Sequence, residues 1–137
     1  MDLSFHEKSL WLMFGSLVTV FAFYFGSVLP NDAADVMPQQ VVMFVLAIIV
    51  LVIMQVAGHV VIAMVDRRTE TDERDRLIEL KGTRNAGYVL ATGVFLSLSL
   101  ALISEGNFVF THVLLGFWVL AQLVEIGSQL ILYRRGA

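Results

Sequence analysis

Residues 41–65 read VVMFVLAIIVLVIMQVAGHVVIAMV, an apolar run whose polar side chains are Gln55 and His59. A helix needs about 20 predominantly apolar residues to cross a hydrocarbon core about 30 Å thick, and this run is long enough. Lipid offers no hydrogen-bond partners to an open strand, so a run of this kind in a bilayer must be helical. The stretch therefore predicts a transmembrane helix.

Three further apolar runs, residues 10–29, 85–103 and 108–133, are also long enough to span a bilayer. Together the four runs predict an all-α fold, a four-transmembrane-helix bundle, with residues 1–137 forming one integral membrane domain. The first run could instead be a secretory signal. We interpret it as a retained helix because it is longer than the roughly 7–15 residues of a signal core, and the segment before it is not clearly basic.

The composition excludes several classes of protein. The chain is 58% hydrophobic and 15% charged, more apolar than a soluble domain of this size, so the lipid bilayer is its expected partner. Its net charge is −3 and its basic residues are mixed with acidic ones, which predicts no nucleic-acid partner. It has no cysteine, which excludes disulfides, thiolate metal sites and cysteine nucleophiles.

The distribution of lysine and arginine predicts the orientation. Of the nine such residues, Lys8 precedes the first run, Arg134 and Arg135 follow the fourth, and the remaining six lie between the second and third runs. The loops at residues 30–40 and 104–107 have none. Basic residues stay on the cytoplasmic side. We therefore expect a multi-pass protein of the cell (inner) membrane with both termini in the cytoplasm, and not a dual-topology protein.

Residues 66–84 form the predicted cytoplasmic segment between the second and third spans. Thr69 or Thr71 could cap a helix, and the acidic residues that follow suit its positive first turn. We expect a helix from about Asp72 that continues into the third span. The segment is either a docking surface for a partner or a solvated, charged helix extension. It lacks the alternating acidic loop that wraps calcium, so no metal site is predicted. The candidate docking residues are Arg74, Leu77, Ile78 and Lys81.

The same segment carries a family resemblance. The run Asp-Glu-Arg-Asp-x-x-Ile at residues 72–78, followed by Arg84 and an apolar helix, resembles a family of small predicted membrane proteins of unknown function in bacteria and archaea. The similarity covers the cytoplasmic segment and the start of the third span, about a fifth of the chain. It implies a prokaryotic origin and no particular activity.

Polar residues inside the spans recur at helical spacing, so each set occupies one face of its helix. At 1.5 Å per residue, His59, Thr92 and Glu125 lie about 9–12 Å from the cytoplasmic boundary. The matched depth predicts that three polar faces converge on one interior that opens toward the cytoplasm. The candidate lining residues are Gln55, His59, Asn85, Tyr88, Thr92, Gln122, Glu125 and Gln129.

His59 and Glu125 could form a coupled pair that binds a proton, a cation or a small polar solute. An ionisable side chain near the centre of a span costs about 2.5–3.5 kcal/mol, so it usually faces the interior and finds a partner. Alternatively, these polar residues bond across helices and fix their packing. The two other histidines, His6 and His112, lie near the water interfaces and are interpreted as surface residues. The aromatic-rich first run suits a lipid-facing or subunit-facing helix.

These patterns predict a small transporter or channel for a proton, a cation or a small polar solute. Four helices enclose little space, so we expect a homo-oligomer. Pairs of small residues such as Gly87–Ala91 and Gly93–Ser97 provide faces for close helix packing. The alternative is a regulatory or scaffold subunit that docks a cytoplasmic or membrane protein through residues 66–84. The sequence contains no recognisable catalytic constellation, so it predicts no cofactor and leaves a membrane enzyme as a third alternative.

Overall fold

The computed structural model describes residues 4–30, 33–65 and 72–136. They form four helices, α1 (Phe5–Val28), α2 (Pro38–Val65), α3 (Glu73–Ile103) and α4 (Phe108–Arg135). All four are long and apolar enough to cross a membrane, and the described ranges contain no strand. The predicted all-α class with four long apolar helices is confirmed, and this is the make-up of a multi-pass membrane protein.

The first helix begins ahead of its apolar run because a capping box starts it. The Ser4 hydroxyl accepts the backbone N–H of Glu7 at 3.2 Å, and the Glu7 carboxylate accepts the N–H of Ser4 at 3.1 Å. These bonds satisfy backbone donors that the first turn of a helix leaves without partners. The start of α1 at Phe5 is therefore fixed by polar groups and not by hydrophobicity.

A second capping box starts α3 where the sequence predicts. The Asp72 carboxylate accepts the N–H of Asp75 at 2.8 Å, and the Asp75 carboxylate accepts the N–H of Asp72 at 3.3 Å. From there α3 continues without a break to Ile103. The alternative caps, Thr69 and Thr71, lie outside the described residues.

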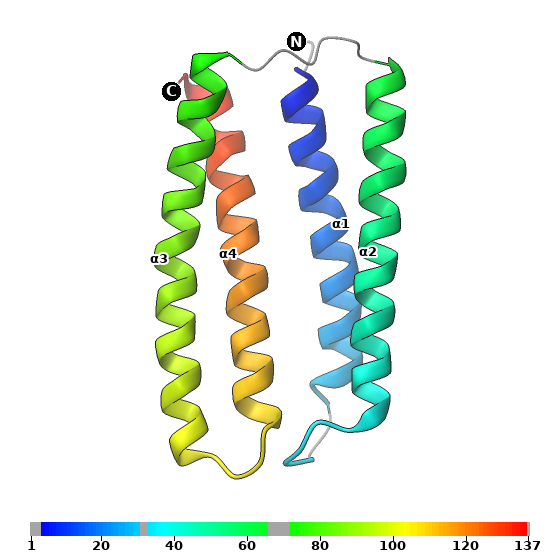
Figure 1. Cartoon of the computed structure of the whole chain (residues 1–137), viewed down its shortest axis with the longest axis vertical. Helices are drawn as coiled ribbons and strands as arrows, with labels where there is room; N and C mark the ends of the chain where they lie inside the picture. Colours follow the sequence, from blue (N-terminus) through cyan, green and yellow to red (C-terminus); the bar gives the residue numbers. More distant parts are fainter. Residues whose placement is uncertain (1–3, 31–32, 66–71, 137) are drawn as a thin grey trace.

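The helices stand side by side in the order α3, α4, α1, α2 (Figure 1). Helix α4 packs against both α3 and α1, and α1 also packs against α2. Within the described residues α2 and α3 do not pack on each other, so the bundle is open along that side. We call the end with the first residues of α1 and α3 the terminal end, and the opposite end the loop end.

Small residues allow α3 and α4 to pack closely. The buried residues on this face of α3 include Gly82, Ala86, Gly93 and Ser97. A Cβ atom on Gly93 would lie 2.1 Å from the Cβ of Phe117 on α4, closer than two non-bonded carbon atoms can approach. By contrast, a Cβ on Gly87 would meet nothing within 4 Å. The predicted Gly93–Ser97 face is thus used inside the chain, and the Gly87 face is left open.

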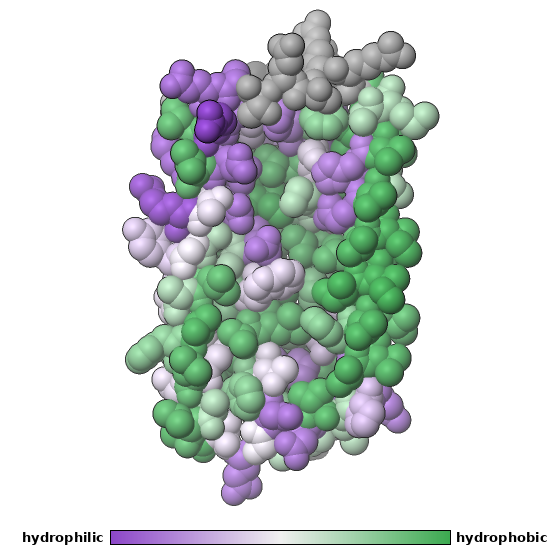
Figure 2. Space-filling view, viewed as in Figure 1, coloured by the Kyte–Doolittle hydropathy of each residue, from purple (hydrophilic) through white to green (hydrophobic). Residues whose placement is uncertain are grey.

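Helix α1 forms the centre of the core. Its Phe21 and Tyr24 side chains are buried, and they pack with α2 and α4. Helix α1 thus lies between two neighbours, but its Phe23 and Trp11 side chains are 73% and 43% exposed, so the expectation that the aromatic-rich first helix faces lipid or another subunit stays a prediction for that side of the helix. The outward apolar surface belongs mainly to α2, on which only Gln40 and Leu51 are buried (Figure 2). Water-soluble monomers rarely expose so large an apolar surface.

At the loop end, hydrogen bonds join the loop between α1 and α2 to the loop between α3 and α4. The Asn107 side chain accepts the N–H of Val36 at 2.7 Å, and the Asp35 carboxylate accepts the N–H of Asn107 at 3.1 Å. Beside them, Gly106 has a φ of 71°, and a Cβ there would lie 2.2 Å from the carbonyl oxygen of Ala34. Only glycine fits this position without moving the backbone.

Candidate functional site: a polar cavity between α1, α3 and α4

A polar cavity of about 320 Å³ lies toward the terminal end. It fills the space between α1 and α3, which do not pack on each other within the described ranges, and α4 forms its remaining wall. Hydrophilic side chains gather over the same end of α3 (Figure 2). The lining residues are Phe5, His6, Ser9, Leu10, Met13, Asp75, Glu79, Gln122, Glu125, Ile126, Gln129 and Tyr133.

The polar face predicted on α4 lines this cavity in full. Gln122, Glu125 and Gln129 follow the helical period at i, i+3 and i+7, so they point in one direction. Gly82 of α3 makes room for them, because a Cβ there would lie 2.7 Å from the Cγ of Gln129 and 2.9 Å from the backbone oxygen of Glu125. The glycine on α3 thus allows the Gln129 side chain and the α4 backbone at Glu125 to lie close to it.

Hydrogen bonds from α3 hold part of this polar face in place. The Thr83 hydroxyl donates to Oε1 of Glu125 at 2.8 Å, and Nδ2 of Asn85 donates to the Ser128 hydroxyl at 3.1 Å. Sequence reasoning found Asn85 and Glu125 but missed Thr83 and Ser128. Small hydroxyl residues are common in helices, and only the position of the neighbouring helix shows which of them has a partner.

The polar face predicted on α3 is divided in the structure. Asn85 reaches α4, but Tyr88 is 69% exposed, and Thr92 is exposed with its hydroxyl donating to the Tyr88 carbonyl at 2.9 Å. The buried positions of α3 include Gly82 and Gly93, and this small-residue face turns toward α4. Tyr88 and Thr92 lie on another side of the helix, so they do not join the cavity.

His59 reaches the cavity through Ser9. Its Nδ1 bonds to the backbone carbonyl of Gln55 at 2.7 Å, and a carbonyl only accepts, so Nδ1 carries the proton. Nε2 of the same ring shares a hydrogen bond with the hydroxyl of Ser9, a residue that lines the cavity. Among the described residues no hydrogen bond joins His59 directly to Glu125. The two predicted partners are instead connected to the same cavity, one through Ser9 and one directly.

Gln55 serves the packing of α1 against α2. Its side-chain amide donates to the hydroxyl of Ser16 at 2.7 Å, and Ser16 is buried. The Ser16 hydroxyl donates in turn to backbone carbonyls of its own helix, the nearer being that of Leu12 at 2.8 Å. Gln55 therefore fits the packing interpretation more closely than the ligand interpretation.

The charge of the cavity favours cations. Its lining includes the carboxylates of Asp75, Glu79 and Glu125, and no lysine or arginine of the described residues lines it. A concave surface lined by one sign of charge concentrates ions of the opposite sign. Within the described ranges no group of three histidine or acidic side chains is arranged to hold a metal ion. The cavity is better suited to protons or to a cation that makes separate contacts with its walls.

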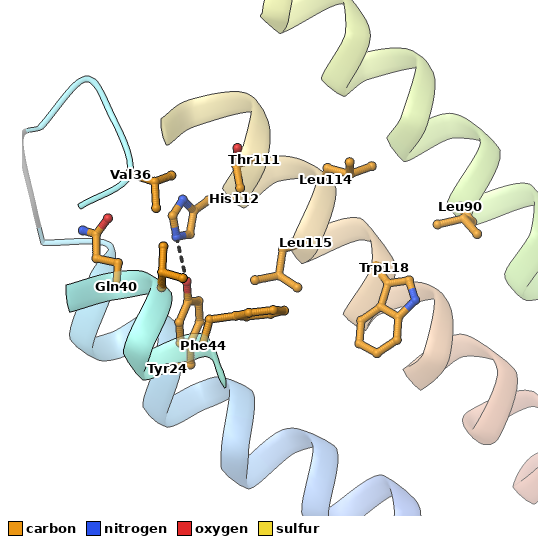
Figure 3. A pocket seen from close by; sticks show the side chains of 11 residues that line it. Tyr24, Val36, Gln40, Phe44, Leu90, Thr111, His112, Leu114, Leu115 and Trp118 are labelled. Atoms are coloured by element: carbon orange, nitrogen blue, oxygen red, sulfur yellow. Dashed lines mark hydrogen bonds between the residues drawn. The ribbon is translucent and has the colours of Figure 1, made fainter. Parts of the chain in front are cut away.

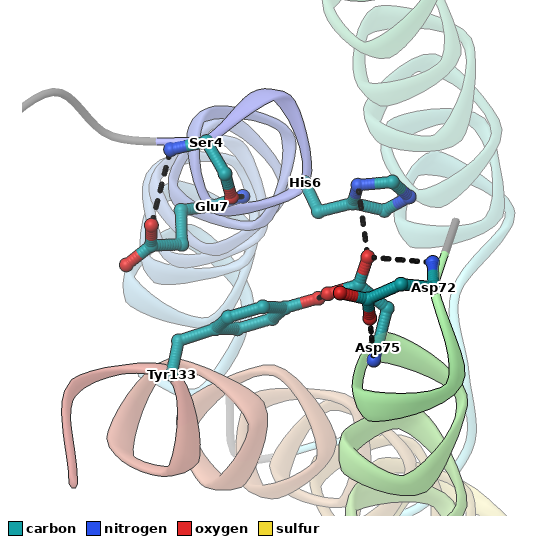
Figure 4. Close-up of polar contacts among 6 residues, drawn as sticks. All are labelled: Ser4, His6, Glu7, Asp72, Asp75 and Tyr133. Carbon is teal, nitrogen blue, oxygen red and sulfur yellow. Dashed lines mark hydrogen bonds and ion pairs between the residues drawn. The ribbon is translucent and has the colours of Figure 1, made fainter. Parts of the chain in front are cut away.

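Asp75 connects three helices at the terminal end of the cavity (Figure 4). The Tyr133 hydroxyl of α4 donates to Oδ1 of Asp75 at 2.6 Å. Nδ1 of His6 on α1 lies 3.8 Å from Oδ2 of the same carboxylate. His6 is partly exposed, in keeping with its predicted place near a water interface.

The predicted docking residues divide between surface and interior. Ile78 is fully buried, and the Arg74 guanidinium donates to the Tyr133 carbonyl at 3.1 Å while lying 5.9 Å from that ring's centroid. Leu77 is 48% exposed, and Lys81 is half-buried. Ile78 thus packs inside the protein and does not lie on a docking surface, because it continues the buried face of α3.

A second cavity, of about 460 Å³, lies toward the loop end and is lined mainly by apolar side chains (Figure 3). His112 borders it and is only 5% exposed, so the interpretation of this histidine as a surface residue is wrong. Its Nδ1 donates to the Phe108 carbonyl at 2.9 Å, and its Nε2 accepts the hydroxyl of buried Tyr24 at 3.1 Å. The His112 ring can be buried because both of its nitrogens have hydrogen-bond partners, the Phe108 carbonyl four residues earlier and the Tyr24 hydroxyl on α1.

No family model, curated protein or solved structure matches this chain. The resemblance of residues 72–78 to small prokaryotic membrane proteins therefore stays a prediction.

Proposed function

We propose that the protein is a small membrane transporter or channel in which the polar cavity binds a proton or a small cation. The observation that carries the proposal is the lining of this cavity, which combines three carboxylates with the amides of Gln122 and Gln129 and has no described basic residue apart from His6. Of the three carboxylates, that of Glu125 belongs to a predicted span, where an ionisable side chain is costly and usually faces a pathway or a partner.

The distribution of charge supports a cytoplasmic opening. In the sequence, all nine lysines and arginines fall in or next to the terminal-end halves of the helices, and the two connections at the loop end carry none. By the positive-inside rule, the terminal end faces the cytoplasm of a cell membrane and both termini lie there. The cavity at this end then opens toward the cytoplasm.

An oligomer would supply the wall of the transport path that one chain lacks. Each chain is open between α2 and α3 within the described residues, and the Gly87 face of α3 is free of packing within the chain. Four helices provide a cavity at one end but little wall around a continuous path. We therefore extend the proposal to a homo-oligomer whose subunits complete the path.

The regulatory-subunit alternative has less support. Of its four docking residues, Ile78 is buried and Arg74 bonds to α4, so the proposed surface is reduced mainly to Leu77 and its neighbours. No observation favours this alternative over the cavity.

Flux measurements in liposomes test the transport proposal. The purified protein is reconstituted, and proton flux is followed with an enclosed pH-sensitive dye while methylammonium uptake is followed with a radiolabel. Glu125→Gln and His59→Ala should reduce flux of the transported cation, since one removes a carboxylate from the cavity and the other removes the partner of Ser9. Glu105→Gln, which neutralises an exposed acid in the loop between α3 and α4, is the matched control.

The outcomes separate the alternatives. Reduced flux in the first two variants with normal flux in the control supports the proposal. Absence of flux in the parent protein, or equal flux in all variants, would remove the transport function. Copurification of a partner protein that depends on Leu77 would then favour the regulatory subunit.

A further inference from the structure

The residues that line the polar cavity form successive levels along its axis. His6, Asp75 and Tyr133 belong to the first turns of α1 and α3 and to the last turn of α4. The other polar lining residues, from Ser9 and Glu79 to Glu125, lie further along these helices from the terminal end. These three polar side chains thus lie at the terminal end of the cavity, beside Phe5.

These outermost side chains are joined to one another. The carboxylate of Asp75 accepts the Tyr133 hydroxyl on one oxygen and faces the His6 ring with the other. Helices α1 and α3 do not pack on each other within the described residues. The contact of His6 with Asp75 therefore bridges two helices that the backbone packing leaves apart.

We propose that His6, Asp75 and Tyr133 form a clasp that closes the terminal end of the polar cavity and opens to admit its solute. The inference rests on the proposed function in one respect, namely that the cavity exchanges its contents with water at this end. The clasp consists of two side-chain contacts at one carboxylate, and the contact of His6 with Asp75 joins α1 to α3.

Asp75 is held in position for this role by its own helix. Its carboxylate also accepts the backbone N–H of Asp72 at 3.3 Å, and its backbone N–H donates to the Asp72 carboxylate. The capping box thus presents Asp75 to both partners. Variants of His6 and Tyr133 are better probes than variants of Asp75, because they leave the start of α3 intact.

The natural absence of cysteine allows a direct test. Met13→Cys places a single thiol in the wall of the cavity, and Gly136→Cys places a reference thiol on the exposed end of the chain. The rate of modification by the water-soluble cationic reagent 2-aminoethyl methanethiosulfonate is measured in proteoliposomes for each reporter. The clasp is then weakened by His6→Gln together with Tyr133→Phe.

Weakening the clasp should make the Met13→Cys thiol react about tenfold faster, because Asp75 loses both the Tyr133 hydroxyl and the His6 ring, and each lost contact raises the open population about threefold. The Gly136→Cys rate should stay the same. Tyr24→Phe, which removes a buried tyrosine hydroxyl near the loop end, is the matched control and should leave both rates unchanged.

Equal Met13→Cys rates in the parent and the double variant would overturn the clasp. If the double variant does not purify as a folded protein, the two single variants answer the same question, each with an expected rise of about threefold. Faster labelling in a protein that shows no flux would uphold the clasp and remove transport. Normal flux with unchanged labelling would uphold transport and overturn the clasp.

Discussion

Ser9 on α1 and His59 on α2 share a hydrogen bond that connects the wall of the polar cavity to a helix outside it. The bond uses Nε2 of the ring, since Nδ1 is engaged by the Gln55 carbonyl. Helix α2 is thus linked to the cavity through the hydroxyl of Ser9.

A double-mutant cycle measures this connection. Ser9→Ala and His59→Ala should each lower the free energy of unfolding in detergent, and the double variant should lose less than their sum. Interhelical bonds in membrane proteins average about 0.6 kcal/mol and reach about 1.7 kcal/mol, which is the expected coupling range. Strict additivity of the two single effects would show that the bond contributes nothing.

Gly93 and Gly87 offer a matched pair on α3. Gly93→Ala should destabilise the protein by about 1–3 kcal/mol, since the added methyl would overlap Phe117 and force α3 away from α4. Gly87→Ala should be neutral or stabilising by up to about 1 kcal/mol, because alanine favours a helix and nothing lies near it. Thermal unfolding in detergent measures both. Similar effects of the two substitutions would contradict the observed packing.

Gly106 should not tolerate a side chain. Gly106→Ala combines a positive φ with a contact of 2.2 Å between the new Cβ and the Ala34 carbonyl oxygen. We expect a loss of at least about 1–3 kcal/mol from the backbone conformation alone. Gly136→Ala is the control, because Gly136 also has a positive φ but has nothing within 4 Å. An equal change in melting temperature for the two variants would show that the contact with Ala34 is unimportant.

The bond between Thr83 and Glu125 can be tested with an isosteric change. Thr83→Val removes the hydroxyl that donates to Glu125 and should cost about 0.6–1.7 kcal/mol of unfolding free energy. Thr92→Val is the control, since the Thr92 hydroxyl donates only to its own helix and is exposed. If Thr92→Val proves the more costly of the two, the interhelical bond is not a source of stability.

The four helices could be predicted because the length and hydrophobicity of a sequence run determine whether it can form a membrane-spanning helix. Residues 41–65 and 108–133 fall within α2 and α4, which extend only a few residues further. The start of α1 was missed, although Ser4 and Glu7 carry the sequence pattern of a capping box. Hydrophobicity alone cannot show where a polar first turn begins.

The site could be predicted only where one helix determines it. Gln122, Glu125 and Gln129 share a face by the geometry of α4 alone, and all three line the cavity. Tyr88 and Thr92 share a face of α3, but the direction of that face depends on which small residues pack against α4. Contacts such as that of Ser9 with His59 join different helices, so the order of the helices had to be known first.

Different contacts hold the helices together at the two ends of the molecule. At the loop end, hydrogen bonds to backbone groups and the close approach of Gly106 to Ala34 hold the connections together. Among the described residues, a side-chain contact bridges α1 and α3 at the terminal end. We therefore expect these two helices to separate more readily at His6 and Asp75 than beside Gly106. Spin labels placed near His6 and Asp75 should report a wide range of distances, and labels beside Gly106 a narrow one.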